Sequence, residues 1–328
     1  MRSLCVLLSG TALAVCASCT DVRLARYRDE RLLNQYHYAL GEQYVDVGGL
    51  RLCYQEQGVG EPVLILPGLG TSIDFWQLNA PVLAERFHVL ALDLPGFGKS
   101  DKPDASYDLA EICERIVAFL DAKGLQRVSI IGGSMGGHIG LLLALSHPER
   151  VDKLVMMGST GDWPSPGPLL NLALTALWND TLVTDYFRSA WPGIYARMSL
   201  RQTPMTQRLF RYQMANRVDA RRFAAEGRAA ARALRSIFYS SCRDRLGEVQ
   251  AEVLLIWGEA DHIHGVDDAR YFHEHLPHSQ LVIVPQAAHE VMIDQPEVFN
   301  RIVAAFLHGG DGEFEASGSK IASQRPAG

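Results

Sequence analysis

The sequence lacks the features that mark several functional classes. It carries 31 lysines and arginines against 37 aspartates and glutamates, for a net charge of −6, and has no basic run suited to nucleic-acid phosphates. Its six cysteines show neither zinc-ligand spacing nor a readable disulfide framework. We therefore expect no nucleic-acid partner and no metal. Outside the N-terminus, Cys53, Cys113 and Cys242 are predicted to be buried thiols, with one disulfide among them left open.

The N-terminal apolar run is too short to span a bilayer comfortably. Residues 1–19 have one arginine and then no charge, as in the hydrophobic region of a secretory signal peptide. The segment ends in Cys16-Ala17-Ser18-Cys19, which resembles the lipobox of bacterial lipoproteins, although Cys16 stands where an aliphatic residue is usual. The resemblance implies lipidation of Cys19 and membrane association. Export is predicted, to the periplasm or as an outer-membrane lipoprotein; plain cleavage or a retained anchor are the alternatives.

The rest of the chain indicates one large domain with an insertion. Residues 20–41 are polar and are predicted to form an N-terminal helix or tether. Apolar strand patterns then alternate with helical patterns, at 62–66, 88–92, 128–131, 151–157, 253–257 and 281–284. Such alternation predicts an α/β fold with a doubly wound, mostly parallel sheet. Ahead of them, Gly48-Gly49 between two strand patterns predicts a two-residue hairpin.

One stretch combines a strand, a sharp turn and a helix around a serine. The sequence RVSIIGGSMGGHIG begins with an apolar strand, breaks at residues 132–136 and is followed by a helical pattern from Gly140 to Leu145. This is the pattern of a nucleophile elbow, in which Ser134 stands above the edge of the sheet. Gly132 and Gly136 are expected because a larger side chain would collide in so tight a turn.

Several motifs in one order resemble the α/β-hydrolase superfamily. They are PGLG at 67–70, DLPGFGKSD at 93–101, GGSMGG at 132–137, GEADH at 258–262 and AAHEV at 287–291. The resemblance covers about residues 42–307 and implies a core of 42–160 and 248–308. It also implies that residues 161–247 form a helical cap. The last stretch, 309–328, is small and polar and is predicted to be disordered.

The resemblance also implies a catalytic triad in the order serine, acid, histidine. A serine hydroxyl needs a base, and the base needs an orienting carboxylate. His289 follows the last strand pattern, and Asp261 stands where similar proteins carry the acid. Asp162, after an earlier strand, is the alternative acid. The neighbouring histidines are expected on the surface or on helices: His262, His264, His273, His275 and His278.

An oxyanion hole needs two fixed N–H donors. The residue after the nucleophile, Met135, is expected to supply one of them. By resemblance the Leu69 amide supplies the other, although this chain has Pro67-Gly68 where many relatives have His-Gly.

The cap is strongly basic. Residues 165–246 contain thirteen arginines, no lysine and five acids, for a net charge of +8. These arginines either attract anionic lipid headgroups or an acidic substrate, or lie on solvated helix faces.

These observations predict an exported serine hydrolase, esterase-like or lipase-like, which cleaves a small-molecule or lipid carboxylic ester through an acyl-enzyme and needs no cofactor. The alternative is a carbon–carbon-bond hydrolase or another serine-dependent member, although the former commonly have tryptophan where this chain has Glu290. Haloalkane dehalogenases and epoxide hydrolases are disfavoured because they use an aspartate at the position of Ser134. A non-enzymatic binding protein is disfavoured because all three triad residues are present.

Overall fold

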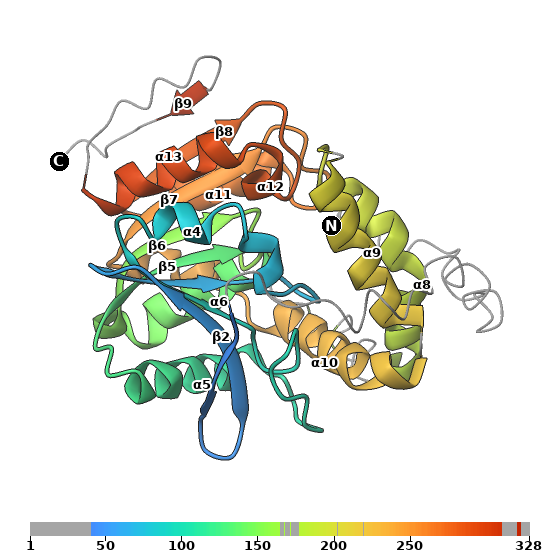
Figure 1. Ribbon diagram of the computed structural model, residues 1–328. Coiled ribbons are helices and arrows are strands. Elements are labelled where there is room, and N and C mark those ends of the chain that lie inside the picture. Colours follow the sequence, from blue (N-terminus) through green and yellow to red (C-terminus); the bar gives the residue numbers. More distant parts are fainter. Residues whose placement is uncertain are drawn as a thin grey trace.

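The computed structural model in Figure 1 describes residues 41–164, 167, 171, 177–201, 203–218, 220–309 and 320–322. The predicted signal segment and nearly all of the predicted tether lie outside the described residues. No helix in the described ranges is long and apolar enough to cross a membrane.

The described strands form a single nine-stranded sheet in the order β1-β2-β4-β3-β5-β6-β7-β8-β9. Their bounds are β1 Gln43–Asp46, β2 Arg51–Gln57, β3 Pro62–Leu66, β4 His88–Leu92, β5 Val128–Gly133, β6 Val151–Met157, β7 Glu252–Gly258, β8 Ser279–Val284 and β9 Lys320–Ala322. The six neighbouring strands β4, β3, β5, β6, β7 and β8 pair in parallel, whereas β1, β2 and β9 join the sheet in antiparallel pairs. The predicted doubly wound, mostly parallel sheet is confirmed.

The predicted hairpin joins β1 to β2. Asp46 pairs with Arg51, and the turn between them is closed by hydrogen bonds between Val47 and Leu50. Gly48 and Gly49 take φ values of +61° and +82°, which a two-residue turn of this hand requires and which glycine adopts without strain.

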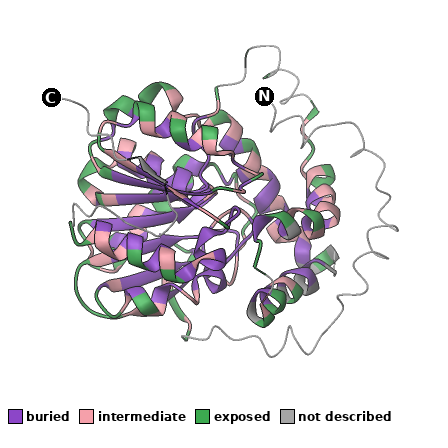
Figure 2. Ribbon diagram, turned by 90° about the horizontal axis from the view of Figure 1, so that it is seen from above, coloured by how far each residue is buried: buried purple, intermediate pink, exposed green. Residues whose placement is uncertain are grey.

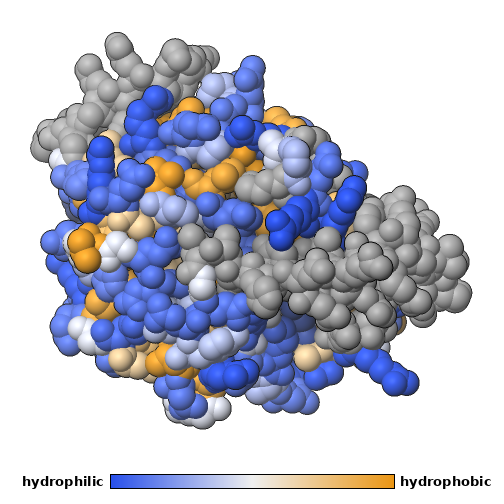
Figure 3. All heavy atoms as spheres, viewed as in Figure 1, coloured by the Kyte–Doolittle hydropathy of each residue, from blue (hydrophilic) through white to orange (hydrophobic). Residues whose placement is uncertain are grey.

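Helices cover both faces of the sheet (Figure 1). On one face α4 (Ala80–Leu83) packs on α13 (Pro296–Leu307), and on the other α5 (Leu109–Ala122) packs on α6 (Met135–Ser146). Short helices η2 (Ile73–Trp76), η3 (Pro148–Arg150), α11 (Val266–His275) and α12 (Val291–Asp294) complete the core. Figure 2 shows buried residues concentrated along the central strands. Figure 3 shows mainly hydrophilic residues on the face of the molecule that is seen in Figure 1.

In its described residues, the insertion between β6 and β7 carries three long helices beside the sheet (Figure 1). These are α8 (Asp180–Met198), α9 (Pro204–Val218) and α10 (Ala220–Tyr239), followed by η4 (Arg243–Glu248). The two ends of the insertion meet, because the Cys242 amide donates a 2.8 Å hydrogen bond to the Gly161 carbonyl. The described part of the predicted cap is thus a helical unit that leaves and rejoins the core at one place.

Part of the predicted disordered tail is a strand. Residues 320–322 form β9, which pairs antiparallel with Leu281–Ile283 of β8. The expectation rested on polar composition, but β8 ends the parallel sheet and exposes unpaired backbone groups that a passing segment can bind. The other residues of 310–328 lie outside the described part of the chain.

The three cysteines in the described residues are buried, as predicted, and all three are free thiols. Burial raises the pKa of Cys53, Cys113 and Cys242 to about 12, so these thiols stay protonated at neutral pH. The alternative of a disulfide among them is excluded.

Candidate active site

Ser134 occupies the tight turn between β5 and α6. Its backbone has φ 51° and ψ −116°, a strained conformation, and its N–H donates a 2.8 Å hydrogen bond to the Met157 carbonyl at the end of β6. A Cβ on Gly132 would lie 2.4 Å from the Gly136 carbonyl, and a Cβ on Gly136 would lie 2.1 Å from the Leu66 oxygen. Only glycine fits at either position, as the sequence predicted.

His289 and Asp261 form a buried pair. The Asp261 Oδ2 lies 2.9 Å from the His289 Nδ1, and the two residues are 5% and 2% exposed. The other Asp261 oxygen accepts hydrogen bonds from the backbone of Ile263 and His264 at 2.8 and 3.0 Å. Because Nδ1 is committed to the carboxylate, Nε2 is the nitrogen that can take a proton from a substrate or a nucleophile.

Two loops that are distant in sequence place this pair. The Ala260 amide donates a 2.9 Å hydrogen bond to the Ala287 carbonyl, which joins the loop after β7 to the loop after β8. A Cβ on Gly258 would lie 2.1 Å from the Ala288 oxygen, so the two loops touch backbone to backbone. The close approach fixes Asp261 against His289 within the fold.

Ser134 and His289 both lie against the end of β6. The serine backbone binds Met157, and a Cβ on the next residue, Gly158, would lie 2.8 Å from the His289 Nδ1 and 3.1 Å from the Asp261 carboxylate. Residues from β5, β7 and β8 therefore meet around one glycine, as expected where parallel strands end at a common edge.

Electrostatics favour the charged form of the pair. Burial alone would raise the pKa of Asp261, but the His289 imidazole outweighs burial and holds that pKa below its ordinary value. Burial alone would lower the pKa of His289, but the Asp261 carboxylate outweighs it and raises that pKa. This aspartate therefore stabilises the imidazolium that forms when the histidine accepts a proton.

The loop with the predicted oxyanion donor Leu69 lies beside the serine. A Cβ on Gly68 would lie 3.2 Å from the Ser134 Cβ. The Gly68 carbonyl accepts hydrogen bonds from the Thr71 amide at 3.2 Å and from the Thr71 hydroxyl at 2.9 Å. In a trans peptide the Leu69 N–H points opposite to this carbonyl and so away from Thr71.

The second predicted donor, the Met135 N–H, belongs to the first residue of α6. A first-turn amide has no acceptor within its own helix and can bind an anion. The structure thus brings the loop with one predicted donor and the amide of the other next to Ser134.

The alternative acid, Asp162, does not bind the histidine. Its side chain is 4% exposed with one oxygen unpartnered within the described chain, and burial raises its pKa to about 7. Its carbonyl instead accepts a hydrogen bond from Arg243. Of the two carboxylates, Asp261 is the one that contacts His289.

The expectation that His264 lies on the surface or on a helix is wrong. It is 4% exposed in the loop before α11, with ring centroids 5.5 Å from His289 and 5.7 Å from Trp163. The backbone bond to Asp261 draws this loop inward, and the Trp257 indole donates a 3.1 Å hydrogen bond to the His264 carbonyl. The rival histidines His262, His275 and His278 are exposed, and His273 is half-buried.

The role of Asp294 is not visible in the sequence. This buried carboxylate of α12 accepts hydrogen bonds from the Ser199 hydroxyl and from the Leu200, Arg201 and Ala288 amides, at 2.5 to 3.0 Å. It therefore ties the turn between α8 and α9 to the loop that carries His289. The sequence shows that Asp294 can accept hydrogen bonds, but it does not show from which donors, because these come from two segments about 90 residues apart.

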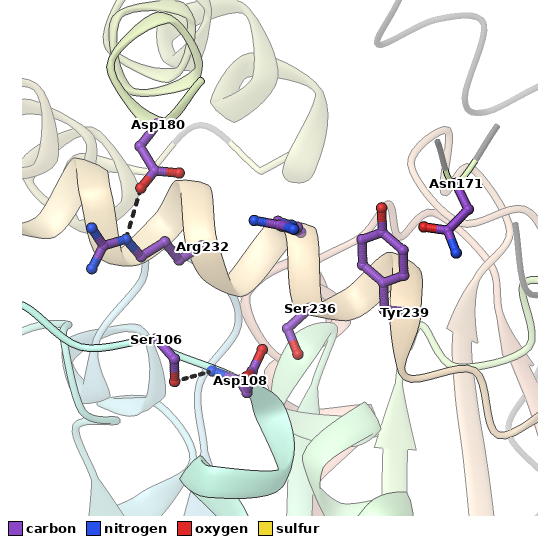
Figure 4. A pocket seen from close by; sticks show the side chains of 8 residues that line it. Ser106, Asp108, Asn171, Asp180, Arg232, Ser236 and Tyr239 are labelled. Atoms are coloured by element: carbon purple, nitrogen blue, oxygen red, sulfur yellow. Dashed lines mark hydrogen bonds and ion pairs between the residues drawn. The ribbon is translucent and has the colours of Figure 1, made fainter. Parts of the chain in front are cut away.

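A polar pocket of about 540 Å³ lies elsewhere, between α10 and the residues that lead into α5 (Figure 4). In it Arg232 donates a 2.7 Å hydrogen bond to Asp180. Its lining contains no candidate triad residue and comprises Ser106, Asp108, Asn171, Asp180, Arg232, Arg235, Ser236 and Tyr239.

Comparison with known proteins agrees with this geometry. Residues 61–296 match the family model described as alpha/beta hydrolase fold. The chain is 31% identical over 268 residues to the 2-hydroxy-6-oxononadienedioate/2-hydroxy-6-oxononatrienedioate hydrolase 1 of Dechloromonas aromatica (strain RCB), which covers 79% of this chain and 91% of that protein.

Two solved structures are also similar. One is a membrane phospholipase A, described as a novel bacterial virulence factor, with a TM-score of 0.69 and 31% identity over 94% of this chain and 96% of that one. The other is a serine hydrolase involved in carbazole degradation, with a TM-score of 0.64 and 28% identity over 82% of this chain and 99% of that one.

Proposed function

Because the chain belongs to the α/β-hydrolase fold family, we propose that it is a serine hydrolase that cleaves carboxylic esters, with acyl lipids as its substrates. His289 takes the proton of the Ser134 hydroxyl as the oxygen attacks the ester carbonyl. The Leu69 and Met135 amides bind the developing oxyanion, and His289 then returns the proton to the leaving alcohol. Water, activated by the same histidine, hydrolyses the acyl-enzyme.

The observation that carries the choice of a neutral ester is the buried acid beside the base. Glu290, 6% exposed, follows His289 directly, and Asp294 is also buried one helical turn later. The charges of Asp261 and Glu290 both act on the histidine, and Asp294 acts in turn on Glu290. The relative from Dechloromonas aromatica is named for dioates, which bear two negative charges, and Glu290 would repel such substrates once it ionises near pH 7. A neutral ester would meet no such repulsion.

The cap supports an acyl chain as the part of the substrate next to the site. Its helices bury large apolar and aromatic side chains, namely Phe187, Trp191, Tyr195, Met198, Leu209 and Met214. Of these, Trp191 lies against Gly70 of the oxyanion loop, and an apolar surface beside a site suits an apolar ligand.

Two further observations favour a lipid at a membrane surface. Residues 186–218 contain six arginines and no acid; Arg188 and Arg217 are buried, and the other four are exposed, namely Arg197, Arg201, Arg208 and Arg211. Clustered arginines are attracted to anionic bilayers. The similarity to a membrane phospholipase A, which spans 94% of this chain, supports the same substrate class. Export through residues 1–19, with lipidation of Cys19, belongs to this proposal.

A second candidate is hydrolysis of a carbon–carbon bond with the same three residues. The name of the relative from Dechloromonas aromatica and the carbazole-degradation hydrolase support it, and the curated relatives favour it over ester cleavage. In this case the bond broken lies next to a ketone in a 2-hydroxy-6-oxo acid.

The test compares the two chemistries on one protein. Purified enzyme is assayed on p-nitrophenyl esters from butyrate to palmitate and on phospholipid in anionic and zwitterionic vesicles. It is also assayed on a 2-hydroxy-6-oxo-dienoate, whose absorbance disappears on cleavage. Ser134→Ala is the inactive variant, and Ser146→Ala, which changes an exposed serine at the far end of α6, is the matched control.

We expect turnover of long-chain esters and phospholipid that Ser134→Ala abolishes and Ser146→Ala retains. Faster turnover on anionic vesicles supports the role of the cap arginines. Turnover of the dienoate alone would favour the second candidate. No turnover of either substrate class by folded protein would refute both.

A further inference from the structure

A fully buried arginine lies in the cap next to the oxyanion loop. Arg217, in α9, is 1% exposed, and burial lowers its pKa to about 10, so the guanidinium stays charged at neutral pH. Within the described part of the chain its ion-pair partner is Glu226, at 4.0 Å. Burying a charge without a close partner is costly, and an apolar residue of similar size would fill the same space at lower cost. The charge therefore calls for a function that packing does not supply.

The guanidinium is held in one orientation by the cap itself. It donates hydrogen bonds to the carbonyl and the side-chain oxygen of Gln213 at 2.8 and 2.6 Å. The Arg217 Cζ lies over two aromatic rings, 4.4 Å from the Trp191 ring centroid and 5.1 Å from the Phe223 ring centroid. Such contacts hold a planar cation more firmly than they would hold a lysine.

Its remaining contact reaches the core. The Arg217 Nη2 donates a 3.2 Å hydrogen bond to the Gly70 carbonyl, across 147 residues of sequence. Gly70 has φ +68° and lies against the same cap residues, since a Cβ there would be 3.1 Å from Trp191. Because glycine has the greatest backbone freedom, the direction of its carbonyl depends on an outside partner.

This contact completes the support of the oxyanion loop. The Gly68 carbonyl is bound by Thr71, as described above, and the Gly70 carbonyl is bound by Arg217. The Leu69 amide lies between these two fixed carbonyls. Without Arg217 one end of the loop would rely on glycine alone.

We propose that Arg217 is a positioning residue that holds the Gly68–Gly70 loop so that the Leu69 amide stays aimed at the oxyanion. The proposal rests on the proposed serine chemistry, but it holds equally for ester and for carbon–carbon-bond cleavage. It acts on the transition state, because the oxyanion exists only during reaction. Loss of Arg217 should therefore lower kcat and leave KM nearly unchanged.

The test uses Arg217→Lys and Arg217→Met, with Arg301→Met on the exposed face of α13 as the matched control. Steady-state kinetics on the best substrate give kcat and KM. Labelling of Ser134 by a fluorophosphonate, whose tetrahedral product also needs the oxyanion donors, gives a rate that does not depend on the natural substrate. Urea unfolding reports stability separately.

We expect Arg217→Met to lower kcat and the labelling rate by about 10- to 100-fold, because removal of one oxyanion donor costs about 10²- to 10³-fold and displacement costs less. KM should change by less than about 3-fold, and added guanidinium should restore part of the rate. The kcat and labelling rate of Arg217→Lys should lie between those of wild type and Arg217→Met. An ammonium group lacks the planar, forked donors with which the guanidinium contacts Gln213 and Gly70 together.

An unchanged labelling rate in folded Arg217→Met would overturn the proposal. So would a rise in KM with constant kcat, which would assign Arg217 to substrate binding. If Arg217→Met fails to fold, Arg217→Lys with wild-type stability decides by the same readouts. If wild-type enzyme is labelled but cleaves none of the substrates tested, the proposed substrate fails while this inference is still decided by the labelling rates.

Discussion

The buried carboxyl of Glu290 should make the stability of this protein depend on pH in a defined direction. Burial is the main cause that raises its pKa, helped by the nearby carboxylates of Asp294 and Asp261 and opposed by His289. The folded protein therefore holds a proton on Glu290 at pH values where the unfolded chain has released it. Replacing the group by the neutral isostere, Glu290→Gln, removes this difference.

The magnitude follows from the pKa. One pKa unit corresponds to about 1.4 kcal/mol, so the rise from the ordinary 4.5 to about 7 amounts to about 3 kcal/mol. Below pH 4.5 both states of Glu290 are protonated and it has no effect. As pH rises, the unfolded state loses its proton first, so the free energy of unfolding falls until the folded group ionises near pH 7. Between pH 5 and pH 8 the loss is about 2.5 kcal/mol.

The assay is urea unfolding of wild type, Glu290→Gln and the exposed control Glu274→Gln at pH 5 and pH 8. The difference in unfolding free energy between Glu290→Gln and wild type should grow by about 2.5 kcal/mol from pH 5 to pH 8, in favour of the variant. Other titrating groups cancel in this difference. The Glu274→Gln variant should follow the wild type at both values.

The same dependence on pH in Glu290→Gln as in wild type would refute the reasoning. It would mean that the Glu290 carboxyl is ionised and solvated in the folded protein. Repulsion of dioates by Glu290 would then extend to lower pH.

Two other predictions concern the geometry of the site. Asp261→Asn should lower kcat by about 10³- to 10⁴-fold, because an amide cannot stabilise the imidazolium, whereas Asp162→Asn should change it by less than about 5-fold; equal losses in the two variants would reopen the choice of acid. Gly136→Ala should destabilise the fold by about 2 to 3 kcal/mol or prevent folding, because the new methyl group meets the last carbonyl of β3. Gly247→Ala has open space around its Cβ and should be neutral in the same unfolding assay.

The sequence by itself determined the class of fold and the residues of the candidate site. Apolar runs that alternate with helical patterns predict a parallel sheet, because the strands of such a sheet are buried on both faces. Gly132 and Gly136 indicate the tight turn at Ser134, because only glycine fits there. The strand ends also indicate where Asp261 and His289 meet, since parallel strands end at one edge.

Only the tertiary structure decided which groups the site brings together from distant segments. In the sequence Asp294 is an ordinary acid and Arg217 is one of thirteen arginines in the cap. Only folding brings donors from the turn after α8 to Asp294 and the Gly70 carbonyl to Arg217. His264 and β9 were misjudged for the same reason, because a polar composition predicts exposure unless a partner far along the chain satisfies it. Local pattern fixes an element and its face, whereas burial of a polar group depends on contacts that close only in the folded chain.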